Sequence, residues 1–535
     1  MKKLTRKIIS VVLSIIMIFS VSAVAFAAEN STDPVIVVSG MGSRPLYGEN
    51  DEIVFPMQSK TIISSVAGMV LPLAGSVGMN NWEIFAKYGT KPIHDLFEQL
   101  KCDENGNSVY NIKPTVYPES SGNYKVFTEA DENETAETAV VRTVADKIGY
   151  DNTYFFNYDW RMNPMSIADE LHEMVEQVKA EKGCAKVSLV GMSFGGMIIS
   201  SYIYKYGADS VKNMVYASTA FNGVELVGRL FSGDPEIEIG AALDYLASFT
   251  QGIEFLSSLL GVSRQVLSNF GVKGEKAIND YLKNIIDVLK YPAYADIFAD
   301  TFGAFQGMWC LMPFEYYEAS KQFMSETINL SSSFYEEVDE YMYNVQSKIA
   351  DIFDYVEENG VNVYVVGAYG YSGIPVSKGS VNHTDNLIDT YLMTGNSIVA
   401  PYGKTLDNVD YSNEGFCTKH NHVSTDNVID AGGCLRPERT WFIKNMRHVE
   451  YKVNTHSADL VAWLASSDCG VDVHSDSNYP QFMELTVSSG EYRSLTNGVK
   501  LDSESTQSSF ISMLKAFFKN LINFIFKILN LGLAS

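Results

Sequence analysis

The chain has 535 residues, with 40 Lys and Arg against 64 Asp and Glu, and its formal net charge is −24. Its hydrophobic fraction of 46% is typical of a globular protein and excludes a mostly disordered chain. The acidic balance argues against nucleic acid as a main partner, because phosphate binding requires a basic surface. Six cysteines are too few for a disulfide scaffold in a chain of this length.

The amino-terminal segment 1–28 has the layout of a secretory signal peptide. A basic start is followed by an apolar run to about Val21 and by small-x-small cleavage sites around Ala25. An uncleaved membrane anchor would share this layout. The later uncharged stretch from Thr61 to Trp82 is interrupted by Pro72 and by glycines, which favours a loop over a spanning helix. We therefore expect a secreted or cell-surface protein, in which disulfides such as one between the loop cysteines 417 and 434 are permitted.

Apolar runs of strand length alternate with helical patterns along the body of the chain. This alternation predicts an α/β protein with a mostly parallel central sheet covered by helices on both faces. The expected strands are 34–39, 154–158, 186–190, 211–217, 361–366 and 440–443, and the expected helices are 135–148, 164–182, 194–206 and 458–465.

The predicted domain covers residues 29–469. Within it, residues 222–360 read as aromatic-rich helices and loops, which we expect to form a lid or cap at the carboxyl edge of the sheet, where ligands bind in such folds. Residues 43–130 form another long excursion. Residues 470–507 are rich in Ser, Asp, Asn and Gly and predict a linker or weakly structured extension.

The carboxyl-terminal segment 508–535 predicts a basic amphipathic helix. It contains no acidic residue between 510 and 533, and its apolar side chains recur at helical spacing. Such a helix suits an anionic membrane surface, although it could equally dock on the body of the protein or self-associate.

The strongest chemical motif is V-S-L-V-G-M-S-F-G-G-M-I-I at 187–199, which contains G-x-S-x-G centred on Ser193. An apolar strand leads into it and an apolar helix leads out, as in the nucleophile elbow, where a serine hydroxyl stands above the sheet edge. A plain glycine-rich turn is the alternative. An acyl reaction also needs donors for its oxyanion, and we expect these to be the amides of Phe194 and of Met41, in the glycine-rich loop after the first strand.

The base and the acid should follow the serine in the order Ser, Asp, His. His448 is the predicted base, because it follows the last central strand by a few residues; His456, at the entry to the final helix, is the competitor. Asp426 and Asp430 are the candidate acids, and position alone barely separates them.

Five segments resemble the lecithin:cholesterol acyltransferase family of α/β-hydrolases. They are PVIVVSGMGS at the oxyanion loop, FFNYDWR at 155–161, LVGMSFGG at the elbow, TDNVID at 425–430 and NMRHVEY around the histidine. The resemblance implies Ser193 as nucleophile, Asp426 as acid and His448 as base, with Met41 and Phe194 as oxyanion donors. Asn427 and Val428 depart from the family's Gly-Thr pair after the acid.

These features predict a secreted serine acyl-hydrolase or acyltransferase of lipid esters, acting through an acyl-enzyme. No metal or organic cofactor is implied, because a triad carries this chemistry alone. The expected partners are the lipid ester and a membrane surface contacted by the terminal helix. The alternatives are a hydrolase of other esters, polyesters or peptides with the same fold, and a catalytically idle surface-binding module.

Overall fold

The computed structural model describes residues 33–114, 122–123, 136–236, 275–276, 278–374, 382–413, 416, 420–448, 455–486 and 491–495. The predicted signal peptide and the predicted carboxyl-terminal helix lie outside these residues. Among them, nine strands form one sheet in the order β15-β14-β13-β8-β7-β6-β1-β5-β4. The seven strands from β14 to β5 are parallel to their neighbours, and only β4 and β15 at the two edges of this sheet pair antiparallel.

The central strands are short, apolar and almost entirely buried, as expected for a parallel sheet covered on both faces. The bounds of all nine strands, the edge strands β4 and β15 included, are β1 (Val35–Val38), β4 (Gly122–Asn123), β5 (Thr153–Phe156), β6 (Val187–Met192), β7 (Val211–Ala217), β8 (Asn362–Tyr369), β13 (Thr440–Lys444), β14 (Phe482–Thr486) and β15 (Glu491–Ser494). In the described part of the chain, three two-stranded ribbons lie outside this sheet: β2 (Leu46–Tyr47) with β3 (Ile53–Phe55), β9 (Tyr371–Ser372) with β10 (His383–Thr384), and β11 (Ile398–Val399) with β12 (Ile429–Asp430).

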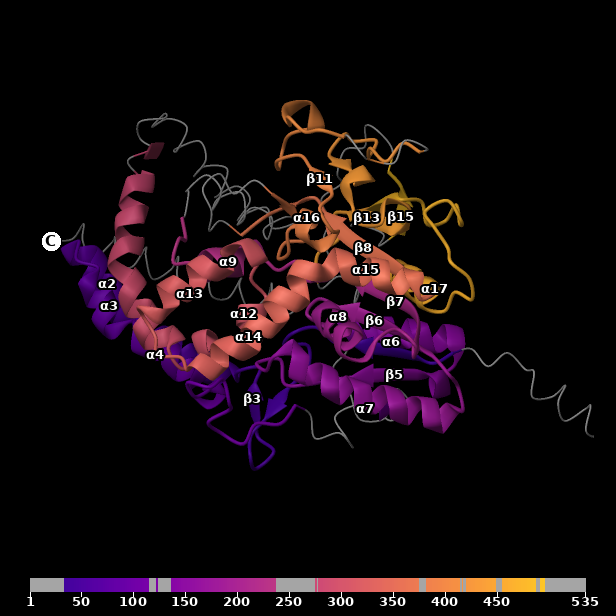
Figure 1. Cartoon of the computed structure of the whole chain (residues 1–535). Helices are drawn as coiled ribbons and strands as arrows, with labels where there is room; N and C mark the ends of the chain where they lie inside the picture. The colour runs from indigo at the N-terminus through magenta and orange to yellow at the C-terminus, as the bar shows by residue number, and fades with distance from the viewer. Residues whose placement is uncertain are drawn as a thin grey trace, which may run out of the picture.

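Alternate residues of each strand enter two separate hydrophobic cores. Ile36 and Val38 of β1 pack in one core and Val35 and Val37 in the other, because successive side chains of a strand point to opposite faces. The first core includes α7 (Pro164–Lys182), α8 (Gly195–Tyr206) and α15 (Ile349–Glu358), and the second includes α6 (Ala136–Ile148) and α17 (Thr455–Ala465). The chain is therefore α/β with helices on both faces of a mostly parallel sheet, compatible with an α/β-hydrolase-like fold (Figure 1).

The excursion after β1 corrects one prediction. The stretch expected to be a loop forms α2 (Ser59–Met79), a 21-residue helix that contains Pro72, and α3 (Glu83–Tyr88) and α4 (Thr90–Phe97) follow. Its residues Lys60–Met79 are long and apolar enough to cross a membrane, with a mean hydropathy of 1.7, and only 11% of them are buried. A single proline therefore did not end the helix. Figure 1 shows α2 and α3 at the far left of the molecule, away from the sheet.

The segment predicted as a lid is helical where it is described. It contains α9 (Glu225–Phe231), α12 (Gln306–Cys310), α13 (Tyr317–Ser325), α14 (Ser332–Asn344) and the sheet-covering α15. It contacts the α2–α4 excursion through polar bonds: Tyr281 accepts a hydrogen bond from the Trp82 indole, and Asp300 pairs with both His94 and Lys101. The two long departures from the sheet therefore pack against each other.

The stretch 470–507 differs from its prediction where it is described. Instead of a linker, it supplies β14, which pairs parallel to β13, and the antiparallel edge strand β15. The apolar residues Phe482 and Met483 lie beside Phe442 and Ile443 in this pairing. The polar composition around these strands concealed them, because each strand is only four or five residues long.

Candidate active site

Ser193 occupies a tight turn between β6 and α8, at the carboxyl edge of the sheet. Its φ angle is 52°, in the left-handed region that a residue other than glycine rarely adopts. Backbone bonds fix this turn: the Ser193 amide donates to the Ala217 carbonyl at 3.2 Å, and the Ser193 carbonyl accepts from Gly196 and Ala220. Strained backbone of this kind persists where the surroundings hold it in place, and it is frequent at active sites.

The three glycines around Ser193 lie where neighbouring atoms leave no room for a Cβ. A Cβ on Gly195 would lie 2.4 Å from the Val38 carbonyl oxygen, and one on Gly191 would lie 2.7 Å from the Gly196 Cα. A Cβ on Gly196 would lie 2.6 Å from Thr219. The absence of side chains therefore lets the elbow press against β1 and the segment after β7, which keeps the serine at the sheet edge.

His448 lies beside Ser193. Its Nε2 atom is 2.9 Å from the Ser193 Oγ atom, and its side chain is 15% exposed. The two residues are 255 positions apart in the chain and meet because parallel strands bring their carboxyl ends to one edge of the sheet: Ser193 follows β6, and His448 follows β13. The sequence prediction of this pairing agrees with the observed distance.

Asp385 is the carboxylate that contacts His448. Its Oδ2 atom is 2.6 Å from the imidazole Nδ1, and its side chain is fully buried. Its Oδ1 atom accepts hydrogen bonds from the amides of Leu387 and Ile388. A carboxylate can only accept here, so Nδ1 carries the proton and Nε2 is left to accept from the Ser193 hydroxyl.

The structure corrects the predicted acid, because Asp426 does not reach His448. Its Oδ2 atom accepts from Lys444 Nζ at 2.9 Å and from the Tyr369 hydroxyl, and its Oδ1 atom accepts from the Ser424 hydroxyl at 2.7 Å. Burial acts to raise the pKa of Asp426, but the hydrogen bonds from Ser424 and Lys444 outweigh it and lower that pKa. Asp426 therefore forms a partly buried ion pair that joins its turn to the end of β13.

The two competing residues also lie elsewhere. Asp430 accepts from the Gly432 amide and the Tyr411 hydroxyl, so it caps a short helical turn. His456 is the second residue of α17 and packs against the Tyr479 ring, with 5.3 Å between ring centroids.

The predicted oxyanion donors lie on the two loops that flank the serine. Phe194 follows Ser193 directly, and Met41 follows β1. Among the described residues, neither amide donates a backbone hydrogen bond. The Tyr158 hydroxyl donates to the Ser39 carbonyl at 2.6 Å, and the Ser39 hydroxyl donates to the Asn157 side chain, so the segment after β5 holds the loop that carries Met41.

Asp159 and Arg161, which follow β5, form an ion pair that ties several parts of the fold together. Arg161 is fully buried and bonds both carboxylate oxygens of Asp159, at 3.0 and 2.6 Å. Its other nitrogen donates to the Leu100 carbonyl, and its own carbonyl accepts from the Gly307 amide on α12. Arg161 thus connects the end of β5 to the segment around Leu100 through its side chain, and to α12 through its backbone carbonyl.

A second carboxylate, that of Asp389, lies on the same loop as Asp385. Asp389, at the start of α16 (Thr390–Met393), accepts from the Asn382 amide and from the backbone amide of Glu225 on α9. Burial raises the pKa of Asp389 to about 7, and the nearby charge of Glu225 acts in the same direction. The loop that carries Asp385 is therefore joined to the insertion through a carboxyl group that titrates near neutral pH.

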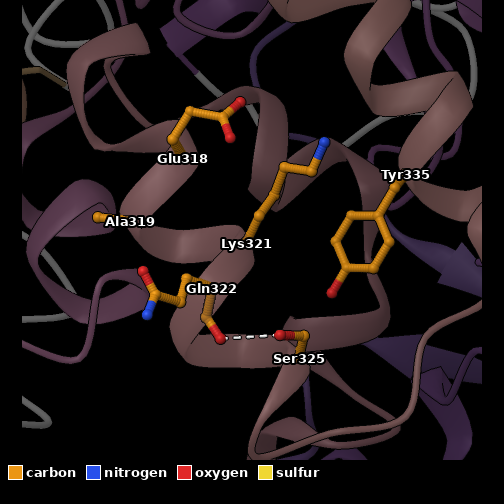
Figure 2. Close-up of a pocket in the computed structure, with 6 residues that line it drawn as sticks. All are labelled: Glu318, Ala319, Lys321, Gln322, Ser325 and Tyr335. Carbon is orange, nitrogen blue, oxygen red and sulfur yellow. Dashed lines mark hydrogen bonds between the residues drawn. The ribbon is translucent and has the colours of Figure 1, made fainter.

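A surface pocket on the insertion is separate from this group. Its volume is about 620 Å³, and its lining comes from α13 and α14: Glu318, Ala319, Lys321, Gln322, Ser325 and Tyr335 (Figure 2). Lys321 is paired with Asp339 and Ser325 donates to the Gln322 carbonyl, so these polar groups already have partners. The pocket contains neither Ser193 nor His448.

The chain matches no protein-family model and no curated protein sequence. It is similar to a chain in the crystal structure of the Tle4–Tli4 complex, with 12% identity and a TM-score of 0.28, over 82% of this chain and 98% of that chain. A likeness at this level carries no argument about fold or function.

Proposed function

We propose that the chain is a serine ester hydrolase with an α/β-hydrolase fold and that Ser193, His448 and Asp385 are its catalytic residues. The observation that carries the proposal is the continuous chain of contacts from the Ser193 hydroxyl through His448 to Asp385, at 2.9 and 2.6 Å. A weakly nucleophilic hydroxyl needs a base, and the base needs a group that fixes its tautomer. The order Ser, Asp, His along the chain is that of the α/β-hydrolases.

The reaction follows from the positions of these groups. His448 accepts the Ser193 proton while the serine oxygen attacks the ester carbonyl, and Asp385 stabilises the imidazolium that forms. The amides of Met41 and Phe194 are the proposed donors to the developing oxyanion. His448 then gives its proton to the leaving alcohol, and the acyl-enzyme passes its acyl group to water. An alcohol acceptor would make the same protein an acyltransferase.

Lipid esters are the proposed substrate class, delivered at a membrane surface outside the cell. The five motif segments resemble the lecithin:cholesterol acyltransferase family, and α2 presents a long apolar surface. The α12 part of the insertion lies against the elbow, since a Cβ on Gly307 would be 3.3 Å from the Phe194 ring. This position supports the insertion as a cap over the acyl group. The basic segment 508–535 is proposed as a second membrane contact.

Covalent labelling tests the proposal directly. A fluorophosphonate should add one adduct to the full chain, mapped to Ser193, and Ser193→Ala should abolish both the adduct and p-nitrophenyl ester hydrolysis. Ser347→Ala, an exposed serine just before α15, is the matched serine control and should label normally. Unchanged turnover in Ser193→Ala would reject the nucleophile, and an unlabelled, correctly folded wild-type chain would favour the idle binding module. Parallel assays on phospholipid, triacylglycerol and polyester then distinguish the substrate classes.

A further inference from the structure

Three histidines and a glutamate gather near the amino-terminal end of β13, whereas Ser193 lies at the carboxyl-terminal ends of the strands. Glu438 lies in the short turn Pro437–Arg439 that enters β13, whereas His448 follows the other end of that strand. His420 Nδ1 is 2.6 Å from Glu438 Oε1, His422 Nε2 is 3.4 Å from the same oxygen, and His474 Nε2 is 3.1 Å from Oε2. This group, the His420–His422–Glu438–His474 cluster, is contributed by three separate segments of the chain.

His422 is the member of the cluster that points to a ligand. It is 3% exposed, and its Nε2 atom has no hydrogen-bond partner among the described residues. Its Nδ1 atom is 2.9 Å from the Gln481 side-chain oxygen. The Gln481 nitrogen donates to the carbonyls of Pro437 and Thr440, so the oxygen of that amide is the acceptor and His422 Nδ1 must carry the proton.

The tautomer of His422 therefore directs a lone pair at a carboxylate. Nε2 is unprotonated in the neutral ring and faces Glu438 Oε1, which also presents only lone pairs. The buried Nε2 lone pair therefore faces a partly exposed carboxylate, and a cation bound between the two would satisfy both. A histidine whose distal nitrogen donates to an amide or carboxylate oxygen, leaving the other nitrogen aimed at a shared point, is the usual arrangement of a metal ligand.

We propose that the His420–His422–Glu438–His474 cluster binds one zinc-type divalent cation. Imidazole with carboxylate suits zinc, whereas calcium and magnesium require mainly oxygen ligands. Two ligand atoms bound about 2.0–2.1 Å from a tetrahedral zinc ion lie about 3.3 Å apart. The 3.4 Å separation of His422 Nε2 and Glu438 Oε1 already has this spacing, and the ligand atoms of His420, His422 and Glu438 all lie within 4.8 Å of one another. The 2.6 Å hydrogen bond between His420 and Glu438 opens as the His420 proton is released.

The ion would have a structural role in this position. It would join the loop before β12, the turn that enters β13, and the loop after α17, where the Val473 amide already donates to the Glu438 carbonyl. His420, His422 and Glu438 would fill three positions of a tetrahedral ion, and His474 would hold the second carboxylate oxygen of Glu438 in place. The cluster is independent of the proposed ester hydrolysis, so either conclusion can fail without the other.

Zinc titration of the full chain, purified without a histidine tag and stripped with EDTA, tests this site. We expect one zinc per chain by competition with a chromogenic chelator, and a higher Tm with zinc but not with calcium. Cobalt should give the intense visible absorption of a tetrahedral site. His420→Ala and Glu438→Gln each remove a proposed ligand, and His474→Ala removes the partner of the second Glu438 oxygen. Each variant should weaken zinc binding by about tenfold or more.

His94→Ala is the matched control, because His94 also lies near two carboxylates, Asp95 and Glu98. Those acids are paired with Lys91 and Lys101, so this variant should bind zinc as the wild type does. The proposal is overturned if the wild type binds no zinc, or if the cluster variants, folded with unchanged Tm in EDTA, bind it as tightly as the wild type. Loss of zinc binding in His94→Ala alone would overturn the proposal and place the ion at His94, Asp95 and Glu98 instead.

Discussion

Asp385 and His448 are joined twice. The carboxylate lies 2.6 Å from the imidazole Nδ1, and the backbone carbonyl of the same aspartate accepts from the backbone amide of His448 at 2.8 Å. The backbone bond fixes the distance between the two loops, and the Leu387 and Ile388 amides fix the rotation of the carboxylate. The orientation of the imidazole toward Ser193 is therefore set before any substrate binds.

Asp385→Asn should lower kcat for a p-nitrophenyl ester by about 10³- to 10⁴-fold, because the amide stabilises the wrong imidazole tautomer and cannot balance its positive charge. The fold should be retained, since Asn can still accept from the two loop amides. Steady-state kinetics with a circular dichroism check measures this.

Asp426→Asn is the matched control, with the same change in the acid predicted from sequence. It breaks the ion pair with Lys444 and should cost about 1–3 kcal/mol of stability while leaving kcat nearly unchanged. If Asp426→Asn lost the activity and Asp385→Asn kept it, the assignment made from the geometry would be wrong.

The sequence could not separate these acids because it contains the same turn twice. Residues 384–389 read T-D-N-L-I-D and residues 425–430 read T-D-N-V-I-D, and the asparagine after each aspartate has a positive φ. Both turns lie between Ser193 and His448 in the chain, so chain order fits either. Only the first follows β8 closely and contacts His448, a difference set by tertiary packing rather than by the motif.

The central sheet was predictable because its strands are buried on both faces and read as apolar runs. The predicted strands 211–217 and 440–443 lie within one residue of β7 and β13, and the predicted helix 164–182 coincides with α7, which begins with Pro164 and ends before Gly183. The predictions of a loop at α2 and of a linker at β14 were wrong, because the local composition of both segments resembles that of irregular structure. The helix α2 contains a proline and glycines yet continues, and β14 has a polar neighbourhood.

Gly195→Ala tests whether the elbow needs its close approach to β1. The added Cβ would lie 2.4 Å from the Val38 carbonyl, so the strand or the turn must shift. We expect a loss of about 1–3 kcal/mol in stability and a large fall in kcat, because Val38 leads directly into the proposed oxyanion loop. Gly78→Ala on α2 has no atom within 4 Å of the new Cβ and should be neutral or slightly stabilising. Equal effects of the two changes on stability and kcat would contradict this account.

Asp389→Asn should change the pH dependence of stability. Because burial raises the pKa of Asp389 to about 7, from about 3.9 in the unfolded chain, the folded state holds this proton more tightly. The stability that the group contributes is present below about pH 4 and lost as pH rises through about 7. The variant should therefore gain stability relative to wild type between pH 5 and 8, by up to a few kcal/mol. Urea unfolding at several pH values measures this gain.

Asp426→Asn should show the opposite trend in the same unfolding experiment. Its carboxyl pKa is lowered in the folded chain, because the bonds from Ser424 and Lys444 outweigh burial. The wild type should therefore be more stable than this variant near neutral pH, and the difference should shrink as pH falls below the ordinary carboxyl pKa. A pH-independent stability difference for both variants would show that neither carboxyl shifts on folding.

Polar substitutions on α2 should weaken vesicle binding without affecting the chemistry. Ile63 and Leu71 are 68% and 80% exposed on a helix whose one charged residue is Lys60, so Ile63→Asn with Leu71→Asn removes apolar contact without changing the charge. We expect about a tenfold or greater loss of binding to zwitterionic vesicles in a flotation assay, with unchanged hydrolysis of a soluble ester. Val109→Asn, 54% exposed outside α2, is the control and should bind normally. Unchanged vesicle binding of the α2 double variant would show that this helix does not contact the membrane.

Deleting the basic segment 508–535 should instead lower binding to anionic vesicles, and the loss should be larger at low salt, where electrostatic attraction is less screened.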